Sequence, residues 1–376
     1  MEAILPGSTI GVLGGGQLGR MLAFEAKRMG YKVVTLDPVP NSPCGQIADK
    51  QIVAEFDDFD AAFKLAEMCD VITYEFENVN VEIVEALEEE NRLYPRSHVL
   101  RITQNRLQEK EFVRNIGIGV VDFCRVECSE DVESGYRKVG LPAILKTVHG
   151  GYDGKGQVVV ESEEDLKRLN IKGQTLIWEK KVPFIKELSV VCARDVRGNV
   201  VTYPVSENIH RENILDMSII PARISKEIEN RAKEVAETIA VKLDIVGVFC
   251  VEMFLLKDGR IFVNEIAPRP HNSGHYTINA CVTSQFEQQL RAVCGLPLGS
   301  TKLLSPAAMV NILGEGRGNS LTGVDELLQD PDISFHFYGK KEAMARRKMG
   351  HITVLADSVE EAIKKAEQKR KQLKWV

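Results

Sequence analysis

An Asp258-Gly259 pair between two runs of apolar and β-branched residues restricts the fold of this chain more than any other feature. Asp-Gly in this setting is a strong signal for the two-residue turn of an antiparallel β-hairpin. Such a turn pairs Lys257 with Arg260 and, counted outward along both strands, places Glu252 directly opposite Glu265. The sequence therefore predicts a hairpin that holds two carboxylates face to face, in a register that a β-bulge would break.

The two opposed glutamates predict a metal site. Facing residues in an antiparallel pair have Cβ atoms about 4.5–5.5 Å apart, and like charges at that distance destabilise the sheet. Mg²⁺ prefers carboxylates together with phosphate oxygens and water, so we expect Glu252 and Glu265 to hold Mg²⁺ beside a nucleotide. The alternative is a solvated face on which nearby lysines neutralise the pair. Four apolar residues expected on the same face disfavour that alternative: Phe254, Leu256, Ile261 and Val263.

A glycine-dense loop between two predicted strands indicates a phosphate site. The loop runs from Gly150 to Gln157, contains four glycines and Lys155, and follows a strand that carries Lys146. Unpaired backbone N–H groups and two lysines suit an anion. The loop is not a Walker motif, because no Ser or Thr follows Lys155 and a strand rather than a helix comes next. We expect a flap that covers phosphates, and the alternative is an ordinary hairpin turn with solvated lysines.

A second glycine-rich loop, Gly14–Gly19, fits the dinucleotide pattern Gly-x-Gly-x-x-Gly between a strand and a helix. Asp37 ends the next strand, where a ribose-binding acid would lie. Taken alone, this loop would indicate an NAD-dependent oxidoreductase. Because any phosphate satisfies the same geometry, we expect a phosphate contact here rather than nicotinamide binding. A tight turn needed only for packing is the remaining alternative.

The spacing of apolar residues divides the chain into three predicted domains. Residues 1–100 alternate strand and helix, which predicts a parallel βαβ domain of the α/β class. Residues 101–296 carry short strands separated by glycines and polar turns, a long helix and the hairpin, which predicts an α+β domain. Gly295–Gly299 is the candidate linker to a small C-terminal domain, residues 297–376.

Charge and cysteine content narrow the class of protein. The 376 residues carry a formal net charge of −6, which gives no overall attraction to nucleic acid or to an anionic membrane. The eight cysteines are scattered without Cys-x-x-Cys spacing and indicate thiols in a reducing compartment. The sequence contains no basic segment followed by a long apolar stretch at its start and no apolar run of about eighteen residues, so we expect a cytoplasmic protein.

Four stretches together resemble the ATP-grasp superfamily and, within it, the 5-(carboxyamino)imidazole ribonucleotide synthases. They are Gly14–Arg20, Thr73–Asn78, Gly150–Gln157 and Asn264–His275. The order of the elements is also similar: a βα domain, a flap, a linker and a metal hairpin. The resemblance implies an ATP-grasp fold of mixed α/β and α+β class, with an N-terminal pre-ATP-grasp domain, a central ATP-grasp domain and a small C-terminal domain.

The resemblance implies ATP and Mg²⁺ as cofactors, with Mg²⁺ on Glu252 and Glu265. The base would lie at Glu179 and its neighbours, and the ribose at Glu187. Asn264 receives no metal role, because many ATP-grasp enzymes place their metal-binding asparagine after the glutamate. The implied ATP contacts are Arg106, Lys146, Gly151, Tyr152, Asp153, Gly154, Lys155, Gly156, Gln157, Glu179, Lys180, Lys181, Val182, Glu187, His210, Asn264 and Glu265.

The implied reaction is ATP- and bicarbonate-dependent carboxylation of 5-aminoimidazole ribonucleotide through carboxyphosphate, in purine biosynthesis. Arg269, His271 and Lys155 are the expected catalytic residues, and a structural role for His271 is the open alternative. In the substrate set below, the first four residues would face ribose and base, the next four bicarbonate, and the last three the substrate phosphate. The set is Gln17, Glu75, Tyr152, Asp153, Arg269, His271, Asn272, Ser273, Lys340, Arg347 and Lys348.

Several alternatives stay open. The nearest is the formate-dependent glycinamide ribonucleotide transformylase, which resembles this layout but usually carries His-Asp-Thr-Gly where this chain has His271–Gly274. An NAD-dependent dehydrogenase and a nucleotide-binding regulator without turnover are candidates from other classes. The basic run Arg346–Lys348 could also be a solvated surface. Family analogy suggests a homodimer.

Overall fold

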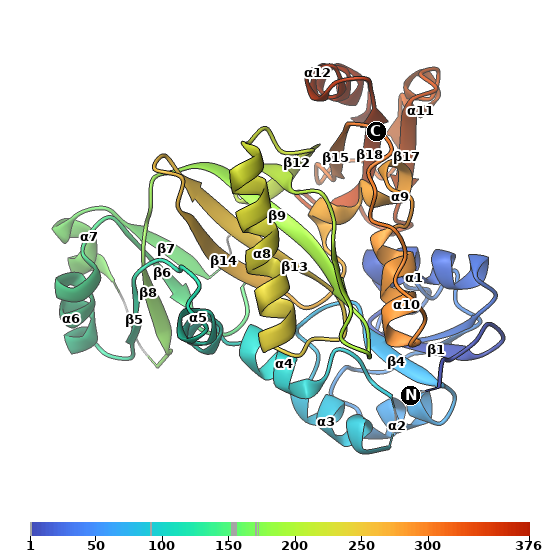
Figure 1. Ribbon diagram of the computed structural model, residues 1–376, viewed down its shortest axis with the longest axis horizontal. Coiled ribbons are helices and arrows are strands. Elements are labelled where there is room, and N and C mark those ends of the chain that lie inside the picture. Colours follow the sequence, from blue (N-terminus) through green and yellow to red (C-terminus); the bar gives the residue numbers. More distant parts are fainter. Residues whose placement is uncertain (1, 91, 152–155, 170, 172) are drawn as a thin grey trace.

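Three β-sheets, a small two-stranded pair and the surrounding helices make up the structure, a computed structural model (Figure 1). It describes residues 2–90, 92–151, 156–169, 171 and 173–376. The mixed α/β and α+β architecture expected from the sequence is confirmed. No helix among the described residues is both long enough and apolar enough to span a membrane.

The N-terminal sheet is parallel throughout, as the strand–helix alternation predicts. Its strand order is β3-β2-β1-β4. Helix α1 buries Met21 and Leu22 against Ile10 and Val12 of the first strand. The elements of this region are β1 (Thr9–Leu13), α1 (Gln17–Arg28), β2 (Lys32–Leu36), β3 (Lys50–Ile52), α2 (Phe59–Ala66), β4 (Val71–Tyr74), α3 (Val81–Glu90) and α4 (Ser97–Thr103).

The protein's own carboxylates fill the Gly14–Gly19 loop. Glu75 accepts hydrogen bonds from the backbone N–H groups of Gly16 and, at 2.7 Å, of Gly19. Asp37 accepts one from Gly15 at 2.7 Å. A phosphate at the start of α1 would need these N–H groups. Three donors of the loop are therefore already bonded to carboxylates, which disfavours both the expected phosphate contact and the dinucleotide interpretation.

Gly14→Ala is expected to lower the free energy of unfolding by about 3 kcal/mol, because two costs add. The residue has φ +103°, and an added Cβ would lie 2.5 Å from Cγ of Glu75. Gly117→Ala is the matched control: its φ is +82°, but an added Cβ would meet no atom within 4 Å. Urea unfolding should give a clearly smaller loss for the control, and equal losses would refute the close approach of Glu75.

The second sheet carries the predicted flap and is antiparallel. Its order is β5-β8-β6-β7. The loop from Gly150 to Gln157 joins β6 to β7, and residues 152–155 of that loop lie outside the described ranges. The elements are α5 (Arg106–Asn115), β5 (Phe123–Val126), α6 (Ser129–Val139), β6 (Ala143–Thr147), β7 (Gln157–Val160), α7 (Glu163–Arg168) and β8 (Leu176–Lys180).

The third sheet has nine strands and holds the hairpin at one end. Its order is β14-β13-β9-β11-β12-β15-β18-β17, with β10 beside β9. Helix α8 lies across it (Figure 1) and buries an alanine-rich stripe, including Ala232 and Ala236, against Val190 and Val251. These strands are β9 (Phe184–Arg194), β10 (Val200–Thr202), β11 (Ser206–Arg211), β12 (Ile214–Ile220), β13 (Gly247–Leu256), β14 (Ile261–Ala267), β15 (Ala307–Leu313), β17 (Ile333–Phe337) and β18 (Lys348–Leu355).

The C-terminal strands extend this same sheet. Strand β15 pairs with β12, so the sheet continues across the proposed boundary at residue 296. The apolar side chains of α12 pack against β15 and β18. The remaining elements are α8 (Lys226–Lys242), the 3-10 turn Asn272–Gly274, α9 (Thr277–Ala280), α10 (Gln285–Val293), β16 (Leu321–Thr322), α11 (Val324–Leu327), α12 (Val359–Arg370) and β19 (Lys374–Trp375).

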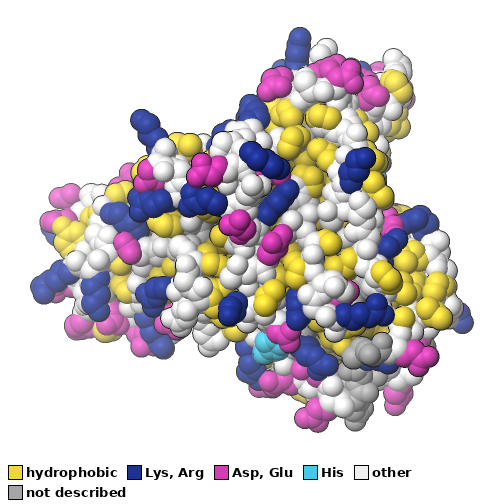
Figure 2. Space-filling model, in the orientation of Figure 1, with side chains coloured by type: hydrophobic (Ala, Val, Ile, Leu, Met, Phe, Trp, Pro, Cys, Tyr) yellow, Lys and Arg dark blue, Asp and Glu magenta, His cyan; other side chains and the backbone are white. Residues whose placement is uncertain are grey.

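Charges of both signs are interspersed over the face shown in Figure 2. Lysine, arginine, aspartate and glutamate side chains alternate there without a continuous basic surface. On this face, attraction of an anion would therefore depend on individual cations rather than on a basic surface.

Candidate active site

The hairpin places Glu252 directly opposite Glu265, as predicted, but by a different route. The turn contains three residues rather than two, because Leu256 rather than Lys257 pairs with Arg260. Asn264 is then an extra residue in β14, in a bulge that restores the register. The predicted pairing of the two glutamates is confirmed, although the turn type and the uninterrupted ladder on which it was based are both wrong.

The bulge also exchanges the faces of β14. Ile261 and Val263, expected beside the glutamates, point to the opposite side and are buried with Met253 under α8. Phe254 stays on the glutamate face, where it lies opposite Phe262. The glutamates therefore occupy a half-open face rather than the mostly buried one that was expected.

A chain of hydrogen bonds anchors Glu252. Nε2 of His271 lies 3.0 Å from a carboxylate oxygen of Glu252, and Nδ1 lies 2.9 Å from the hydroxyl of Ser273. Ser189 and Asn208 continue the chain through buried hydrogen bonds of 2.7 and 2.9 Å. Both ring nitrogens of His271 are thus engaged. This arrangement favours an orienting role for His271 over a role as general base.

Electrostatics hold Glu252 charged. Burial alone would raise the pKa of Glu252, but the neighbouring His271 outweighs burial and lowers that pKa. Burial alone would lower the pKa of His271, but the Cys250 thiol and the Glu252 carboxylate reverse that effect and raise it. The pair is therefore ionised at neutral pH.

Glu265 is the less compensated member of the carboxylate pair, because Arg106 and Lys146 act on it only from beyond ion-pair distance. Its side chain is open to solvent but has protein on most sides, and loss of hydration together with the charge of Glu252 raises its pKa. No basic side chain forms an ion pair with Glu265 within the described ranges. The described residues contain no group of three or more potential metal ligands either. Two carboxylates and no third ligand fit Mg²⁺, which usually completes its shell with phosphates and water.

The predicted base-binding residue Glu179 lies in a buried ion cluster. Its carboxylate lies 2.7 Å from Nζ of Lys146 and 3.5 Å from Nζ of Lys110. Glu179 is 3% exposed and Lys110 is equally buried. The two lysines outweigh burial, which alone would raise the pKa of Glu179, and they lower that pKa. Lys146 and Glu179 therefore lie together, as the resemblance implies. Lys110 also belongs to this cluster, although the sequence did not predict it.

Arg106 holds the start of the flap. Its guanidinium donates to the carbonyl of Thr147 at 2.9 Å, to that of Gly150, and to that of Gly151 at 2.8 Å. The rest of the predicted flap site lies outside the described residues: Tyr152, Asp153, Gly154 and Lys155. Gly156 and Gln157 follow at the start of β7.

The predicted ribose residue Glu187 and the predicted ATP contact His210 meet on the glutamate face. Glu187 of β9 pairs across the ladder with Phe254, two residues beyond Glu252. His210 of β11 lies 2.8 Å from the Glu187 carboxylate. Lys180 and Lys181 point elsewhere, since Lys180 donates to the Leu141 carbonyl and Lys181 pairs with Glu161.

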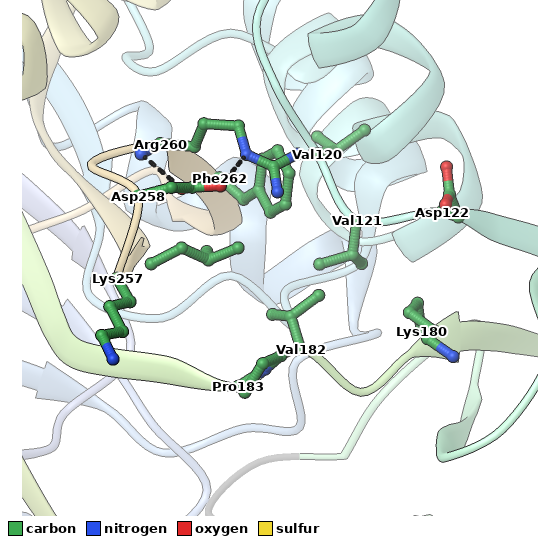
Figure 3. A pocket seen from close by; sticks show the side chains of 11 residues that line it. Val120, Val121, Asp122, Lys180, Val182, Pro183, Lys257, Asp258, Arg260 and Phe262 are labelled. Atoms are coloured by element: carbon green, nitrogen blue, oxygen red, sulfur yellow. Dashed lines mark hydrogen bonds and ion pairs between the residues drawn. The ribbon is translucent and has the colours of Figure 1, made fainter.

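A pocket of about 710 Å³ lies beside the linker between the second and third sheets (Figure 3). Lys180 and Val182 of the predicted base-binding segment line it together with the hairpin tip. Figure 3 shows Arg260 bonded to Asp258 at that tip. Glu252 and Glu265 do not line this pocket, so it is separate from the carboxylate pair.

The described residues of the predicted substrate set come from the regions of the first and third sheets. Arg269 is fixed by Glu77, which accepts two hydrogen bonds from the guanidinium, one of them 2.8 Å long. Asn272 exchanges hydrogen bonds of 3.0 and 2.6 Å with Asn311 of β15. Gln17 is half-buried at the start of α1, next to the Glu75 carboxylate that caps Gly16.

The C-terminal cations divide into two groups. Burial raises the pKa of Glu75, and Lys340 is among the groups that oppose this rise, so Lys340 lies near the N-terminal sheet. Lys348 acts in the same way on Glu252 and lies near the hairpin of β13 and β14. Arg347 instead donates to the carbonyl of Glu342, 3.2 Å away. Lys340 and Lys348 are therefore the cations that the fold brings toward the predicted substrate residues.

His275, the last residue of the Asn264–His275 stretch, is part of a histidine stack inside the protein. Its ring centre lies 4.8 Å from that of His351, which lies 4.4 Å from that of His336. His351 contacts the Tyr338 hydroxyl at 2.8 Å, and His336 contacts Asn279 at 2.8 Å. The stack connects the loop that follows β14 to the C-terminal strands, so His275 has a structural role.

Acid should destabilise the protein through this stack. Burial lowers the pKa of His336 from 6.5 to about 4. As the pH falls below 6.5, His336 becomes protonated in the unfolded chain but stays neutral in the folded chain. This difference lowers the free energy of unfolding by about 3 kcal/mol at pH 4. His336→Gln can still donate to Asn279 but cannot titrate. Urea unfolding between pH 4 and 7.5 should give a shallower acid slope for this variant, and identical slopes would contradict the assignment.

Three residues of the site were missed in the sequence: Glu77, Glu109 and Lys110. Glu77 belongs to the Thr73–Asn78 stretch, but its partner Arg269 is distant in sequence. Glu109 and Lys110 are adjacent charged residues in α5 that are each only 3% exposed. Local sequence gives no signal for them, because charged residues in a helix are usually solvated.

Comparison with known proteins agrees with this geometry. Residues 7–104 match the ribonucleotide synthetase preATP-grasp domain, residues 111–286 the ATP-grasp domain, and residues 307–365 the phosphoribosylaminoimidazole carboxylase C-terminal domain. The order of domains and the paired glutamates define an ATP-grasp enzyme.

Similarity to individual relatives shows to which family of ATP-grasp enzymes the chain belongs. The N5-carboxyaminoimidazole ribonucleotide synthase of Bacillus subtilis (strain 168) is 47% identical over 368 residues, which are 96% of this chain and 95% of the relative. A synthetase from Staphylococcus aureus solved with ADP superimposes with a TM-score of 0.92 at 40% identity, covering 98% of this chain and 99% of that one. The chain belongs to the N5-carboxyaminoimidazole ribonucleotide synthase family, which confirms the resemblance seen in the sequence.

A third relative was solved with both ADP and 5-aminoimidazole ribonucleotide. This synthase, from Aspergillus clavatus, is 35% identical, has a TM-score of 0.90, and covers 97% of this chain and 98% of its own. The similarity extends over all three sheets, including the C-terminal strands.

Proposed function

We propose that this chain catalyses the ATP- and bicarbonate-dependent carboxylation of 5-aminoimidazole ribonucleotide to 5-(carboxyamino)imidazole ribonucleotide, with release of ADP and phosphate, in de novo purine biosynthesis. The observation that carries the proposal is the Glu252–Glu265 pair: Glu265 forms no ion pair among the described residues, and the charge of Glu252 opposite it raises its pKa. Its location beside Glu187 and Lys146 suits an ATP phosphate chain. Family membership supplies the substrate.

The reaction requires charge to be stabilised on the transferring phosphoryl group. A bicarbonate oxygen attacks the γ-phosphorus and ADP leaves, giving carboxyphosphate. The exocyclic amine of the ribonucleotide then attacks the carboxyl carbon, and inorganic phosphate leaves with loss of the amine proton. Lys146 can stabilise charge on the phosphates, while Glu187 and His210 suit the ribose hydroxyls. Mg²⁺ held by Glu252 and Glu265 would supply the further positive charge that this step needs.

Arg269 is proposed to orient bicarbonate. Its guanidinium is pinned by two hydrogen bonds to Glu77, and it follows directly after the metal-binding strand β14. A guanidinium fixed in this way can still present its remaining donors to a small anion. His271 is proposed to position Glu252 rather than to remove a proton, because both of its nitrogens are already bonded.

The ribonucleotide is proposed to bind between the N-terminal sheet and the C-terminal strands. Glu75 follows β4 of the N-terminal sheet and Lys340 lies between β17 and β18, and Lys340 acts on Glu75 electrostatically. A cation close to a carboxylate suits a ligand with a phosphate at one end and hydrogen-bond donors at the other.

The test is the substrate dependence of ATP turnover. ADP release should require both 5-aminoimidazole ribonucleotide and bicarbonate, and a carbamate product should accumulate in equal amount. Strong stimulation by formate with glycinamide ribonucleotide would instead support the transformylase alternative and overturn this proposal. A homodimer in the cytoplasm is proposed by family analogy alone, and sedimentation at micromolar concentration would test the dimer.

A further inference from the structure

The backbone on both sides of Glu265 is held by helix α5. Strand β14 is the edge of its sheet, so its outward N–H and C=O groups need partners from elsewhere. The carboxylate of Glu109 accepts from the N–H of Ile266 at 2.7 Å, and Nζ of Lys110 donates to the carbonyl of Asn264 at 3.0 Å. Two adjacent residues of α5 therefore hydrogen-bond to the backbone of β14 immediately before and after Glu265.

These two bonds fix the orientation of Glu265. The Asn264 carbonyl belongs to the peptide group that precedes Glu265, and the Ile266 N–H belongs to the peptide group that follows it. Only two rotations, φ and ψ of Glu265, separate these peptide planes. Holding both planes therefore fixes the direction in which the Glu265 side chain leaves the backbone.

The bulge makes such support necessary. Asn264 is the extra residue of the bulge, and β14 has a neighbouring strand on one side only. A one-residue shift in β14 would turn Glu265 away from Glu252, because side chains alternate between faces. Glu109 and Lys110 are each 3% exposed, so water cannot readily replace their bonds to the strand.

We propose that Glu109 and Lys110 are positioning residues that set the direction of Glu265 and thereby the affinity of the nucleotide site for Mg²⁺. This inference rests on the proposed metal site at Glu252 and Glu265. Lys110 also contacts Glu179, so the same residue connects the metal strand to the predicted base-binding residue. Glu109 touches no other part of the predicted ATP site through a hydrogen bond in the described ranges and is the cleaner of the two to test.

The experiment compares the affinity for a non-hydrolysable ATP analogue with and without Mg²⁺, by isothermal titration calorimetry. The ratio of the dissociation constant without Mg²⁺ to that with Mg²⁺ measures how much the metal strengthens nucleotide binding. Glu109→Ala and Lys110→Met should lower this ratio about tenfold, the size expected when support for a metal ligand is lost. Glu109→Gln, which can still accept from Ile266, should stay within about twofold of wild type.

Two controls separate the possible failures. Val113→Ala in the same helix removes a fully buried apolar group, so it should lower the melting temperature without changing the ratio. Glu265→Gln should lower the ratio by itself. A normal ratio in Glu109→Ala together with a lowered one in Glu265→Gln would overturn the positioning role alone. A normal ratio in Glu265→Gln would overturn the metal site and the positioning role with it.

Discussion

Glu265→Gln is expected to reduce the rate of ADP formation about a thousandfold and, at the same time, to stabilise the ligand-free protein. The rate falls because a neutral amide is a poor ligand for Mg²⁺ and leaves the phosphate charge uncompensated. Stability rises because burial and the charge of Glu252 raise the pKa of Glu265, although Arg106 and Lys146 oppose the rise. Steady-state kinetics at saturating Mg²⁺ and urea unfolding without ligands measure the two effects.

The opposite signs make this prediction specific. A carboxyl group whose pKa is raised in the folded state costs stability once the pH exceeds its unfolded value, and glutamine removes that cost. Glu252→Gln is the contrasting variant: it also loses a metal ligand, but it breaks the ion pair with His271 and should lower stability. Wild-type turnover in Glu265→Gln would remove Glu265 from the chemistry.

Glu179→Leu is expected to lower the free energy of unfolding by about 3–5 kcal/mol, because it leaves the buried Lys110 and the partly buried Lys146 without their counter-ion. Lys146 and Lys110 lie 2.7 and 3.5 Å from the Glu179 carboxylate. The pKa of Glu179 is lowered, so the contribution of the cluster is present at neutral pH and is lost as the pH falls below about 4.5. Chemical unfolding at pH 7 measures the loss.

A double variant tests whether the cluster acts as a unit. Lys110→Met combined with Glu179→Leu should cost less than the sum of the single changes, with a coupling of about 1–3 kcal/mol. Strict additivity would mean that the contact between Lys110 and Glu179 contributes nothing. Glu179→Leu should also weaken ATP binding, because Lys146 would lose the contact that orients it.

The N-terminal sheet could be predicted from local sequence, whereas the hairpin could be predicted only in part. Strands and helices of residues 9–74 alternate with clear apolar spacing, and parallel pairing follows from that alternation. The Asp258-Gly259 pair fits a two-residue turn and a three-residue turn equally well, since Gly259 has positive φ in either case. The extra residue in the turn is offset by the bulge at Asn264, so Glu252 and Glu265 still face each other. Local sequence does not signal this bulge.

Long-range pairing accounts for most of what the sequence could not predict. The hairpin of β11 and β12 turns through Glu212 and Asn213, both with positive φ and without the glycine that usually marks such a turn. The continuation of the central sheet into the C-terminal strands depends on pairing between β12 and β15, which no local pattern signals. The contacts of Lys110 with Asn264 and of Glu77 with Arg269 join distant segments in the same way.

Oxygen-18 shows directly whether bicarbonate attacks the γ-phosphorus of ATP. With ¹⁸O-labelled bicarbonate, ATP and 5-aminoimidazole ribonucleotide, the inorganic phosphate released should carry one labelled oxygen per turnover. That oxygen joins phosphorus when carboxyphosphate forms and stays there when the bond to carbon breaks. Mass spectrometry of the phosphate gives the answer. Unlabelled phosphate would mean that water rather than bicarbonate attacks ATP, and it would contradict the account.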